Sequence, residues 1–251
     1  MNILFGMFDD IKKNNFGKVE IRIYFREISI IEFYNDRFEK SLKKIDNLIS
    51  RFNKKVNRYN ITRDIDKVLM VYTYIFNNIL CDYEYNKLSK KQKKMWFESL
   101  NYLERRKLRK TQTLEGIITK KTVCTGYSYI FKVLLNRLGI KSIINIGYYI
   151  DREKEIPHRL NTVKIDNDWY NIDITIGLTE YKKIIKGKIP KYFLLSDKKF
   201  EKRYIRLLED RNNFGTKLII KCAEKDYKRE LIRKSFKRLK DDYNIILKWY
   251  R

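Results

Sequence analysis

The chain has 251 residues, of which 43% are hydrophobic and 14% aromatic, and it carries a formal net charge of +26. This apolar content excludes a disordered chain despite 35% charged residues, and the length predicts one large domain or one domain with extensions. The N-terminus lacks the basic start of a secretory signal, and no stretch approaches the roughly 20 apolar residues of a membrane span. We therefore expect a cytoplasmic protein without a transmembrane segment.

The N-terminal part of the chain predicts one strand and two helices. Lys18–Glu27 partly alternates apolar and charged residues, as a strand does. Apolar residues recur at helical spacing over Phe38–Phe52, and a clearer apolar stripe covers Ile65–Ile79. Thr62 or Asp64 could cap this second helix, because a short polar side chain there accepts hydrogen bonds from the first turn.

Two segments concentrate the positive charge. Asn86–Lys110, which we expect to be helical, holds ten Lys or Arg residues against two acids, and Lys221–Lys240 holds nine against three. Such clusters bind polyanions by releasing counterions, so one prediction is contact with nucleic acid or with another acidic partner. The alternative is a set of solvated surfaces, because the remaining charge is spread along the chain.

The middle of the chain predicts a helix beside an antiparallel sheet. An amphipathic helix follows Cys124 and ends at Gly139, since glycine is favoured just past a helix C-terminus. Ile140–Tyr149 follows as a buried strand, and Leu160–Ile165 with Trp169–Ile176 has the pattern of a hairpin. A further short β-like segment precedes a basic, mostly helical tail. These elements predict an α+β fold.

Cys124 is placed where a thiol becomes reactive. It is far in sequence from Cys81 and Cys222, without metal-ligand spacing, so we expect no disulfide framework, no metal and no cofactor. A sulfur at a helix N-terminus is stabilised as thiolate by unpaired N–H groups, which could also donate to an oxyanion. Thr125 and Gly126 are small enough to admit a substrate. The alternative role is that of a small apolar residue, the usual role of a free cysteine.

The hairpin register decides whether His158, the single histidine of the chain, can meet Asp173. A two-residue turn or a four-residue loop pairs His158 with Thr175 and Asp173 with Leu160, which puts both side chains on one face as diagonal neighbours. A three-residue loop would separate them. The apolar residues of both arms share a face only in the first case, so we expect contact. His158 could then take the proton of Cys124 while Asp173 fixes the ring tautomer.

Several segments occur in the order of a known family. They are VCTGYS at Val123–Ser128, LGI at Leu138–Ile140, VKID at Val163–Asp166, WYNIDIT at Trp169–Thr175 and YFLLSD at Tyr192–Asp197. Together they resemble the transglutaminase-like superfamily of papain-related cysteine enzymes, and specifically its bacterial members. The resemblance implies a papain/transglutaminase-like core in which the nucleophile helix packs on the antiparallel sheet.

The same resemblance suggests a division of the chain. The catalytic core would span residues 61–199, after an N-terminal strand and helix extension at 1–60. A basic, mostly helical C-terminal segment would occupy 200–251. If that segment were an interaction tail for an acidic partner, truncation near Lys198 would spare the turnover of small substrates.

Residue roles also follow from the resemblance. Cys124 would be the nucleophile, His158 the base and Asp173 the third member of a triad. Four further residues are candidates for the surroundings of the oxyanion or the substrate: Gln112, Thr125, Gly126 and Asn161. One departure affects the substrate range, because the family's HAWN motif is here His158-Arg159-Leu160-Asn161.

The resulting prediction is a cysteine-dependent acyl-transfer enzyme that acts on a protein or peptide substrate. A thioester at Cys124, formed from a peptide or glutamine-type amide, would be resolved by water, as in a peptidase or deamidase, or by an amine, as in a transglutaminase. The alternative is a catalytically reduced binding protein of the same fold that uses its basic surface for nucleic acid or another polyanion. The sequence leaves the oligomeric state open.

Overall fold

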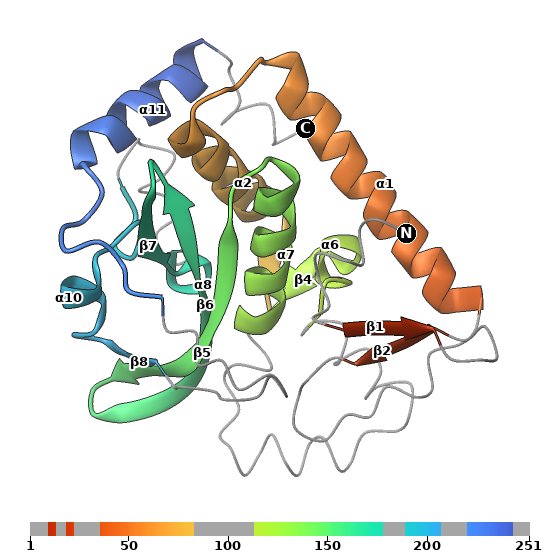
Figure 1. The fold of residues 1–251 in the computed structure, drawn as a ribbon, viewed down its shortest axis with the longest axis horizontal. Coiled ribbons are helices and arrows are strands. Elements are labelled where there is room, and N and C mark those ends of the chain that lie inside the picture. The colour runs from red at the N-terminus through yellow and green to blue at the C-terminus, as the bar shows by residue number, and fades with distance from the viewer. Residues whose placement is uncertain are drawn as a thin grey trace.

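The computed structural model describes residues 10–13, 19–22, 36–82, 113–177, 189–206 and 220–242 (Figure 1). Asn86–Lys110 and Gln112 therefore lie outside the described residues. β1 (Asp10–Lys13) and β2 (Val19–Arg22) form an antiparallel pair. The expected strand is confirmed for the residues of β2.

Two long helices follow. α1 spans Asp36–Arg58 and α2 spans Asp64–Asn78, which confirms both helices expected from apolar spacing. The capping prediction is wrong. The N-cap of α2 is Arg63, and no side-chain hydrogen bond caps this end, so neither Thr62 nor Asp64 has that role.

The central helix, α7, spans Cys124–Arg137 and ends as predicted, with Gly139 at a φ of 80°. Glycine adopts this left-handed conformation without the steric cost that a side chain brings. Before α7, α6 (Gly116–Thr119) leads into β4 (Lys121–Thr122), which pairs in parallel with β3 (Leu80–Cys81). This pairing brings the end of α2 beside the start of α7.

The main sheet has the strand order β7-β6-β5-β8, and each neighbouring pair is antiparallel. Its strands are β5 (Ser142–Asp151), β6 (Lys154–Ile165), β7 (Asp168–Ile172) and β8 (Tyr204–Arg206). α7 packs against β5 and β6, as Figure 1 shows. A helix on an antiparallel sheet is the predicted α+β arrangement, which is confirmed.

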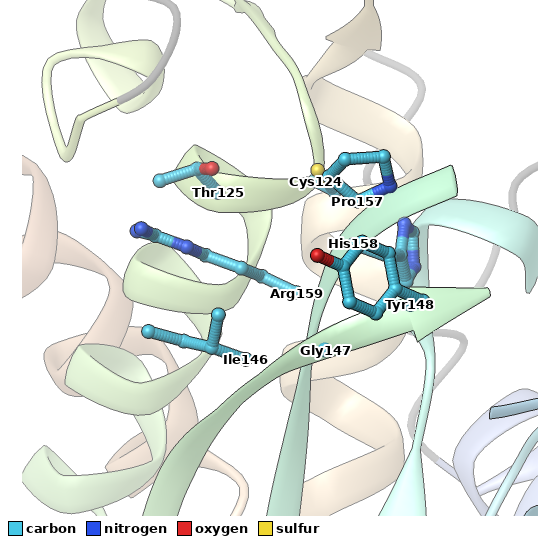
Figure 2. Close-up of a pocket in the computed structure, with 8 residues that line it drawn as sticks. All are labelled: Cys124, Thr125, Ile146, Gly147, Tyr148, Pro157, His158 and Arg159. Atoms are coloured by element: carbon cyan, nitrogen blue, oxygen red, sulfur yellow. The ribbon is translucent and has the colours of Figure 1, made fainter. Parts of the chain in front are cut away.

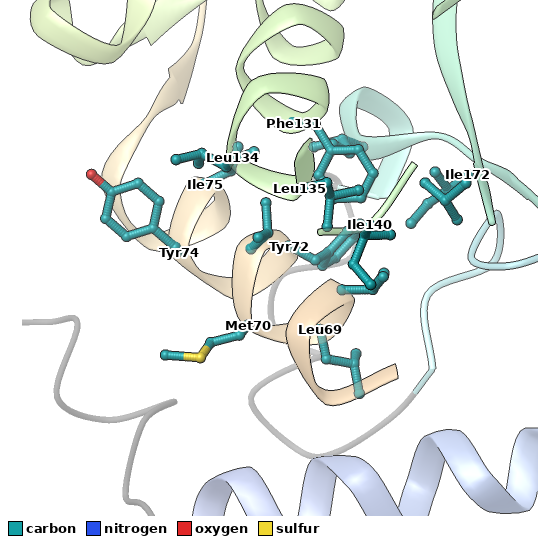
Figure 3. Close-up of a cluster of buried hydrophobic side chains, with 14 of the residues drawn as sticks. Leu69, Met70, Tyr72, Tyr74, Ile75, Phe131, Leu134, Leu135, Ile140 and Ile172 are labelled. Carbon is teal, nitrogen blue, oxygen red and sulfur yellow. The ribbon is translucent and has the colours of Figure 1, made fainter. Parts of the chain in front are cut away.

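The main core fills the space between α2, α7 and one face of this sheet (Figure 3). Tyr72 and Ile75 of α2, Phe131 and Leu135 of α7, and Ile172 of β7 are all completely buried there. α1 contributes its own buried residues to the same core, namely Ile45, Ile49, Phe52 and Val56. Each Å² of apolar surface that is buried stabilises the fold by about 25 cal/mol. The packing of this core therefore fixes the position of α7, and with it the position of Cys124.

β6 and β7 join through a two-residue turn. Asp166 and Asn167 form it with φ angles of 49° and 73°, and Asn161 pairs with Ile172. Asn and Asp tolerate positive φ better than other side chains, which suits them to this tight turn. The observed pairing is the even register expected from the sequence, so that prediction is confirmed.

The second arm of the hairpin is shorter than expected. We predicted a strand over Trp169–Ile176, but β7 ends at Ile172, and α8 (Ile174–Gly177) begins two residues later. The side chain of Asp173 explains the change. Its Oδ1 accepts a hydrogen bond from the backbone N–H of Ile176 at 3.0 Å, as an N-cap residue does.

The chain beyond residue 199 contributes to this same assembly. α10 (Asp197–Phe200) leads into β8, which completes the sheet beside β5. α11 (Arg229–Asp241) packs on α2 and buries Ile232, Phe236 and Leu239 in the main core. A truncation near Lys198 would remove β8 and α11. The sheet would then lose a strand, so the C-terminal segment is not a tail that can be removed without damage to the fold.

Candidate active site

Cys124 is the first residue of α7, where the chain leaves the extended conformation of Val123. Its sulfur is hydrogen-bonded to the side chain of His158 and to the backbone N–H of Arg159. Burial alone raises the pKa of the Cys124 thiol, but these two hydrogen bonds and the charge of His158 outweigh it and lower the pKa. The site therefore favours a thiolate.

His158 lies on β6, opposite Gly147 of β5, and is 9% exposed. Its Nε2 lies 2.8 Å from Oδ2 of Asp173, which leaves Nδ1 for the sulfur of Cys124. Burial alone lowers the pKa of the imidazolium, but the charge of Asp173 and hydrogen bonds to both partners outweigh it and raise the pKa to about 10. The arrangement favours an imidazolium beside a thiolate.

Asp173 is completely buried, and three donors hold its carboxylate. His158 and the hydroxyl of Tyr204 both bind Oδ2, the latter at 2.6 Å, and the backbone N–H of Ile176 binds Oδ1. Burial alone raises the pKa of this carboxyl, but the charge of His158 and these hydrogen bonds lower it below the ordinary value. The carboxylate is therefore ionised and fixed in orientation.

Tyr204 reaches Asp173 because β8 adds to the sheet beside β5. Its ring stacks on Phe200, with ring centroids 4.0 Å apart, and is 1% exposed. Gly147 permits this approach, because a Cβ there would lie 1.9 Å from the carbonyl oxygen of Ile205. Sequence reasoning missed Tyr204 and Gly147, since β8 is three residues long and gives no strand pattern.

A pocket of about 320 Å³ lies in front of the Cys124–His158 pair (Figure 2). It is lined by Cys124, Thr125, Ile146, Gly147, Tyr148, Pro157, His158 and Arg159. In the close-up, Thr125, Ile146 and the side chain of Arg159 lie on one side, and Cys124, Pro157, His158 and Tyr148 on the other. A small substrate segment could therefore reach the sulfur.

Of the four residues expected around the oxyanion or the substrate, the structure places one at the pocket. Thr125 lines the pocket, whereas Gly126 is buried in the first turn of α7. Asn161 is 1% exposed, and its Nδ2 donates to the backbone carbonyl of Ser128 at 3.0 Å, which ties β6 to α7. Gln112 lies outside the described residues.

Within the described part of the chain, no cluster of three or more His, Cys, Asp or Glu side chains could hold a metal ion. None of its helices is long and apolar enough to cross a membrane.

A thiol at a helix start, an imidazole on the adjacent sheet and a carboxylate behind it are the elements of a papain-like cysteine site. The sequence profile of a family described as a transglutaminase-like domain matches residues 44–198. The chain belongs to this family, which confirms the resemblance noted from its motifs. The profile ends before β8, so it does not include Tyr204.

Two solved structures are similar to part of the chain. One is described as a TGase, with 20% sequence identity and a TM-score of 0.42, covering 59% of this chain and 35% of that one. The other is a candidate cysteine protease from Cytophaga hutchinsonii, with 20% identity and a TM-score of 0.35, covering 52% of this chain and 37% of that one. This chain thus spans little more than a third of either protein. No curated protein matches it significantly.

Proposed function

We propose that the protein is a cysteine-dependent acyl-transfer enzyme in which Cys124 is the nucleophile, His158 the general acid and base, and Asp173 the residue that orients His158. The continuous contact from the sulfur through the imidazole to the carboxylate carries the proposal. The substrate class would be peptide or glutamine-type amides. Such a carbonyl would enter the pocket beside the sulfur.

In the first step the thiolate of Cys124 attacks the amide carbonyl, and the C–N bond breaks. The leaving amine takes the proton of the His158 imidazolium, and a thioester remains. Backbone N–H groups in the first turn of α7 lack carbonyl partners within the helix and could donate to the oxyanion that forms in this step.

In the second step His158, now neutral, takes a proton from the acceptor, which attacks the thioester. Water gives a carboxylic acid, and a primary amine gives a new amide. In both cases the sulfur leaves as thiolate and the imidazolium is restored. The protein would be a peptidase or deamidase in the first case and a transglutaminase in the second.

One experiment separates these branches. The protein is incubated with casein as the acyl donor and a labelled primary amine as the acceptor, and three products are measured: incorporated label, released ammonia and cleaved peptide. Incorporation with ammonia release indicates a transglutaminase, ammonia alone a deamidase, and cleavage a peptidase. Cys124→Ala should abolish each of them, and a product that persists in this variant would not come from the proposed site.

Thiol reactivity tests the proposal without a substrate. At about pH 6, where an ordinary thiol with a pKa of about 8.5 is protonated, iodoacetamide should label Cys124 well before Cys81 and Cys222. Burial and the charge of Asp197 raise the pKa of the Cys222 thiol to about 12, which makes it an internal reference. Equal labelling of the three residues, measured by peptide mass spectrometry, would show that the activated pair is absent.

A second candidate function is binding of nucleic acid through α11. Its solvent-facing side is basic, with exposed Arg229, Arg233, Lys234, Lys237 and Lys240. Retention on mixed DNA or RNA at low salt, lost as salt rises, would support this function. Arg233→Glu with Lys237→Glu should then weaken binding. Absence of retention at low salt would eliminate it.

A further inference from the structure

An apolar row crosses three adjacent strands beside the reacting sulfur. Tyr148 on β5 pairs with Pro157 on β6 and with Ile205 on β8. Residues that lie directly opposite each other in antiparallel strands share a face of the sheet, so these three side chains form one continuous row. Neighbouring strands lie about 4.8 Å apart, and the row spans two such spacings. This length suits one large apolar side chain of a bound peptide.

The apolar row begins at the pocket and leads away from it. Pro157 and Tyr148 line the pocket together with Cys124, and the three lie on the same side of it in the close-up (Figure 2). Ile205 adjoins Tyr148 on the side away from Pro157. An extended peptide advances about 3.3 Å per residue. When a carbonyl lies at the sulfur, the side chain of the adjacent residue therefore has the apolar row within reach.

The apolar row is accessible to such a side chain. Pro157 is exposed, Tyr148 is half-buried and Ile205 is 39% exposed. Within the described part of the chain, Ile205 is one of three large hydrophobic residues with exposed side chains. Single exposed apolar residues are ordinary, but a contiguous set that borders a reactive group is typical of a ligand site. Because the row adjoins the nucleophile, its occupant is the molecule that the nucleophile attacks.

We propose that the apolar row binds an apolar side chain of the acyl donor, on the residue next to the one whose carbonyl Cys124 attacks. This inference rests on the proposed function and specifies its substrate. Peptides with an aromatic or branched aliphatic residue at that position are preferred over peptides with a polar one, because apolar surface of both partners leaves water. Tyr148 and Ile205 are the specificity-determining residues.

Two alkylating reagents with the same reactive group test this preference. Iodoacetamide and N-benzyl-iodoacetamide both lose iodide to the Cys124 thiolate with formation of a thioether, but only the second carries an aromatic ring. Their rate ratio cancels changes in thiolate content, because both react with the same sulfur. Division by the ratio for N-acetylcysteine corrects for intrinsic reactivity. The corrected ratio of the benzyl reagent to iodoacetamide should exceed one, and Ile205→Ser should lower it about fourfold, the factor that about one buried methylene group contributes.

Ile156→Ser is the matched control. Ile156 is 43% exposed on β6, close to the value for Ile205, but its side chain lies on the opposite face from Pro157 because neighbours in a strand alternate. The control therefore removes a similar apolar side chain away from the row and should leave the ratio as in the wild type. Tyr148→Ser changes the row on a second strand and should lower the ratio as Ile205→Ser does. Wild-type ratios in both row variants, or an equal loss in Ile156→Ser, would overturn the proposal.

Protection from iodoacetamide identifies which neighbour of the attacked residue occupies the apolar row. Three blocked dipeptides are compared: acetyl-Phe-Gln-amide, acetyl-Gln-Phe-amide and acetyl-Ser-Gln-amide, the last without an apolar side chain. Slower labelling of Cys124 with one phenylalanine peptide than with the serine peptide supports the proposal and gives the order of the two residues, provided that Ile205→Ser abolishes the difference. If neither phenylalanine peptide protects better than the serine peptide, the row does not bind a side chain of the donor.

The two proposals can fail separately. If Cys124 labels fast at about pH 6 but the ratio does not depend on Ile205 or Tyr148, the nucleophile stands and the apolar site does not. If Cys124 labels no faster than Cys81 and Cys222, the proposed chemistry itself is wrong.

Discussion

Tyr204 and His158 donate to the same oxygen, Oδ2 of Asp173, from two different strands of the described sheet, β8 and β6. The Tyr204 hydroxyl lies 2.6 Å from this oxygen and Nε2 of His158 lies 2.8 Å from it. Tyr204 comes from β8, which pairs with β5, whereas Asp173 follows β7. The carboxylate that orients the imidazole is thus itself oriented by a strand that the family profile does not cover.

Tyr204→Phe should weaken the site without unfolding the protein. The ring of Phe can keep the stacking on Phe200, but the charge-assisted hydrogen bond to Asp173 is lost. A bond of this kind contributes about 1.5 kcal/mol or more to holding the carboxylate in place. Without it Asp173 holds His158 less firmly, so the iodoacetamide rate of Cys124 at about pH 6 should fall, by at most about tenfold. Burial and Asp173 raise the pKa of the Tyr204 hydroxyl, which keeps it a donor throughout the experiment.

The matched control is Tyr227→Phe. Its hydroxyl donates to Asp166 at 2.7 Å in the hairpin turn, so the change removes a comparable bond away from the sulfur. Thermal unfolding should detect both substitutions, and only Tyr204→Phe should change the labelling of Cys124. Equal labelling rates in the two variants would exclude a positioning role for Tyr204.

The free energy of unfolding should depend on pH through the ionised pair of His158 and Asp173. His158 has a folded pKa of about 10, above its unfolded value of 6.5, so its contribution is complete below pH 6.5 and is lost as pH rises towards 10. Asp173 has a lowered folded pKa, so its contribution is present above pH 3.8 and is lost as pH falls further. The pair therefore stabilises the fold most between these two limits.

The measurement is the difference in unfolding free energy between the wild type and Asp173→Asn, from urea titrations at a series of pH values. This difference should reach a few kcal/mol between about pH 4 and pH 6.5 and shrink on both sides. Taking the difference cancels the titration of Cys222, which the substitution does not touch. A difference independent of pH would contradict an ionised pair.

The sequence predicted those parts of the site that depend on local patterns. The apolar stripe and Gly139 predict the helix that begins at Cys124, and the even register of the hairpin predicts that His158 meets Asp173. Both follow from periodicity and turn chemistry, which operate over a few residues. The local pattern did not predict the end of β7 at Ile172. The side chain of Asp173 caps α8, and this hydrogen bond competes with continued strand pairing.

Non-local contacts account for the rest. β8 forms because its three residues pair with β5, and a segment this short has no periodicity of its own. Tyr204 is therefore one of many tyrosines in the sequence until the fold brings it to Asp173. Gly147 was likewise inconspicuous, since its role depends on the approach of Ile205 from a distant segment.

Gly147→Ala should disrupt the contact between β5 and β8. The new Cβ would lie 1.9 Å from the carbonyl oxygen of Ile205, a backbone atom that cannot rotate away. We expect β8 to shift, with a loss of about 1–3 kcal/mol in unfolding free energy and slower labelling of Cys124 as Tyr204 moves. Gly139→Ala is the control, because that position has no neighbour within 4 Å and only its φ of 80° opposes a side chain. If both variants labelled like the wild type, the position of β8 would not matter to the thiolate.

Asp66 should be important for stability without affecting the site. It is 3% exposed on α2, where Oδ2 lies 3.1 Å from Nε of Arg238 and Oδ1 accepts the hydroxyl of Ser235, both on α11. Asp66→Ala removes the acceptor of the Ser235 hydroxyl and the ion-pair partner of Arg238. Removal of one partner from a buried ion pair typically costs about 3–5 kcal/mol. Asp64→Ala is the matched control in the same helical turn. The Asp64 carboxylate lies 3.9 Å from Nζ of Lys67 in a more exposed ion pair, so its removal should cost at most about 1 kcal/mol. Urea unfolding measures the difference, and labelling of the folded protein at about pH 6 should stay fast in both variants. A large loss of Cys124 reactivity in folded Asp66→Ala would show instead that α11 acts on the site through α2.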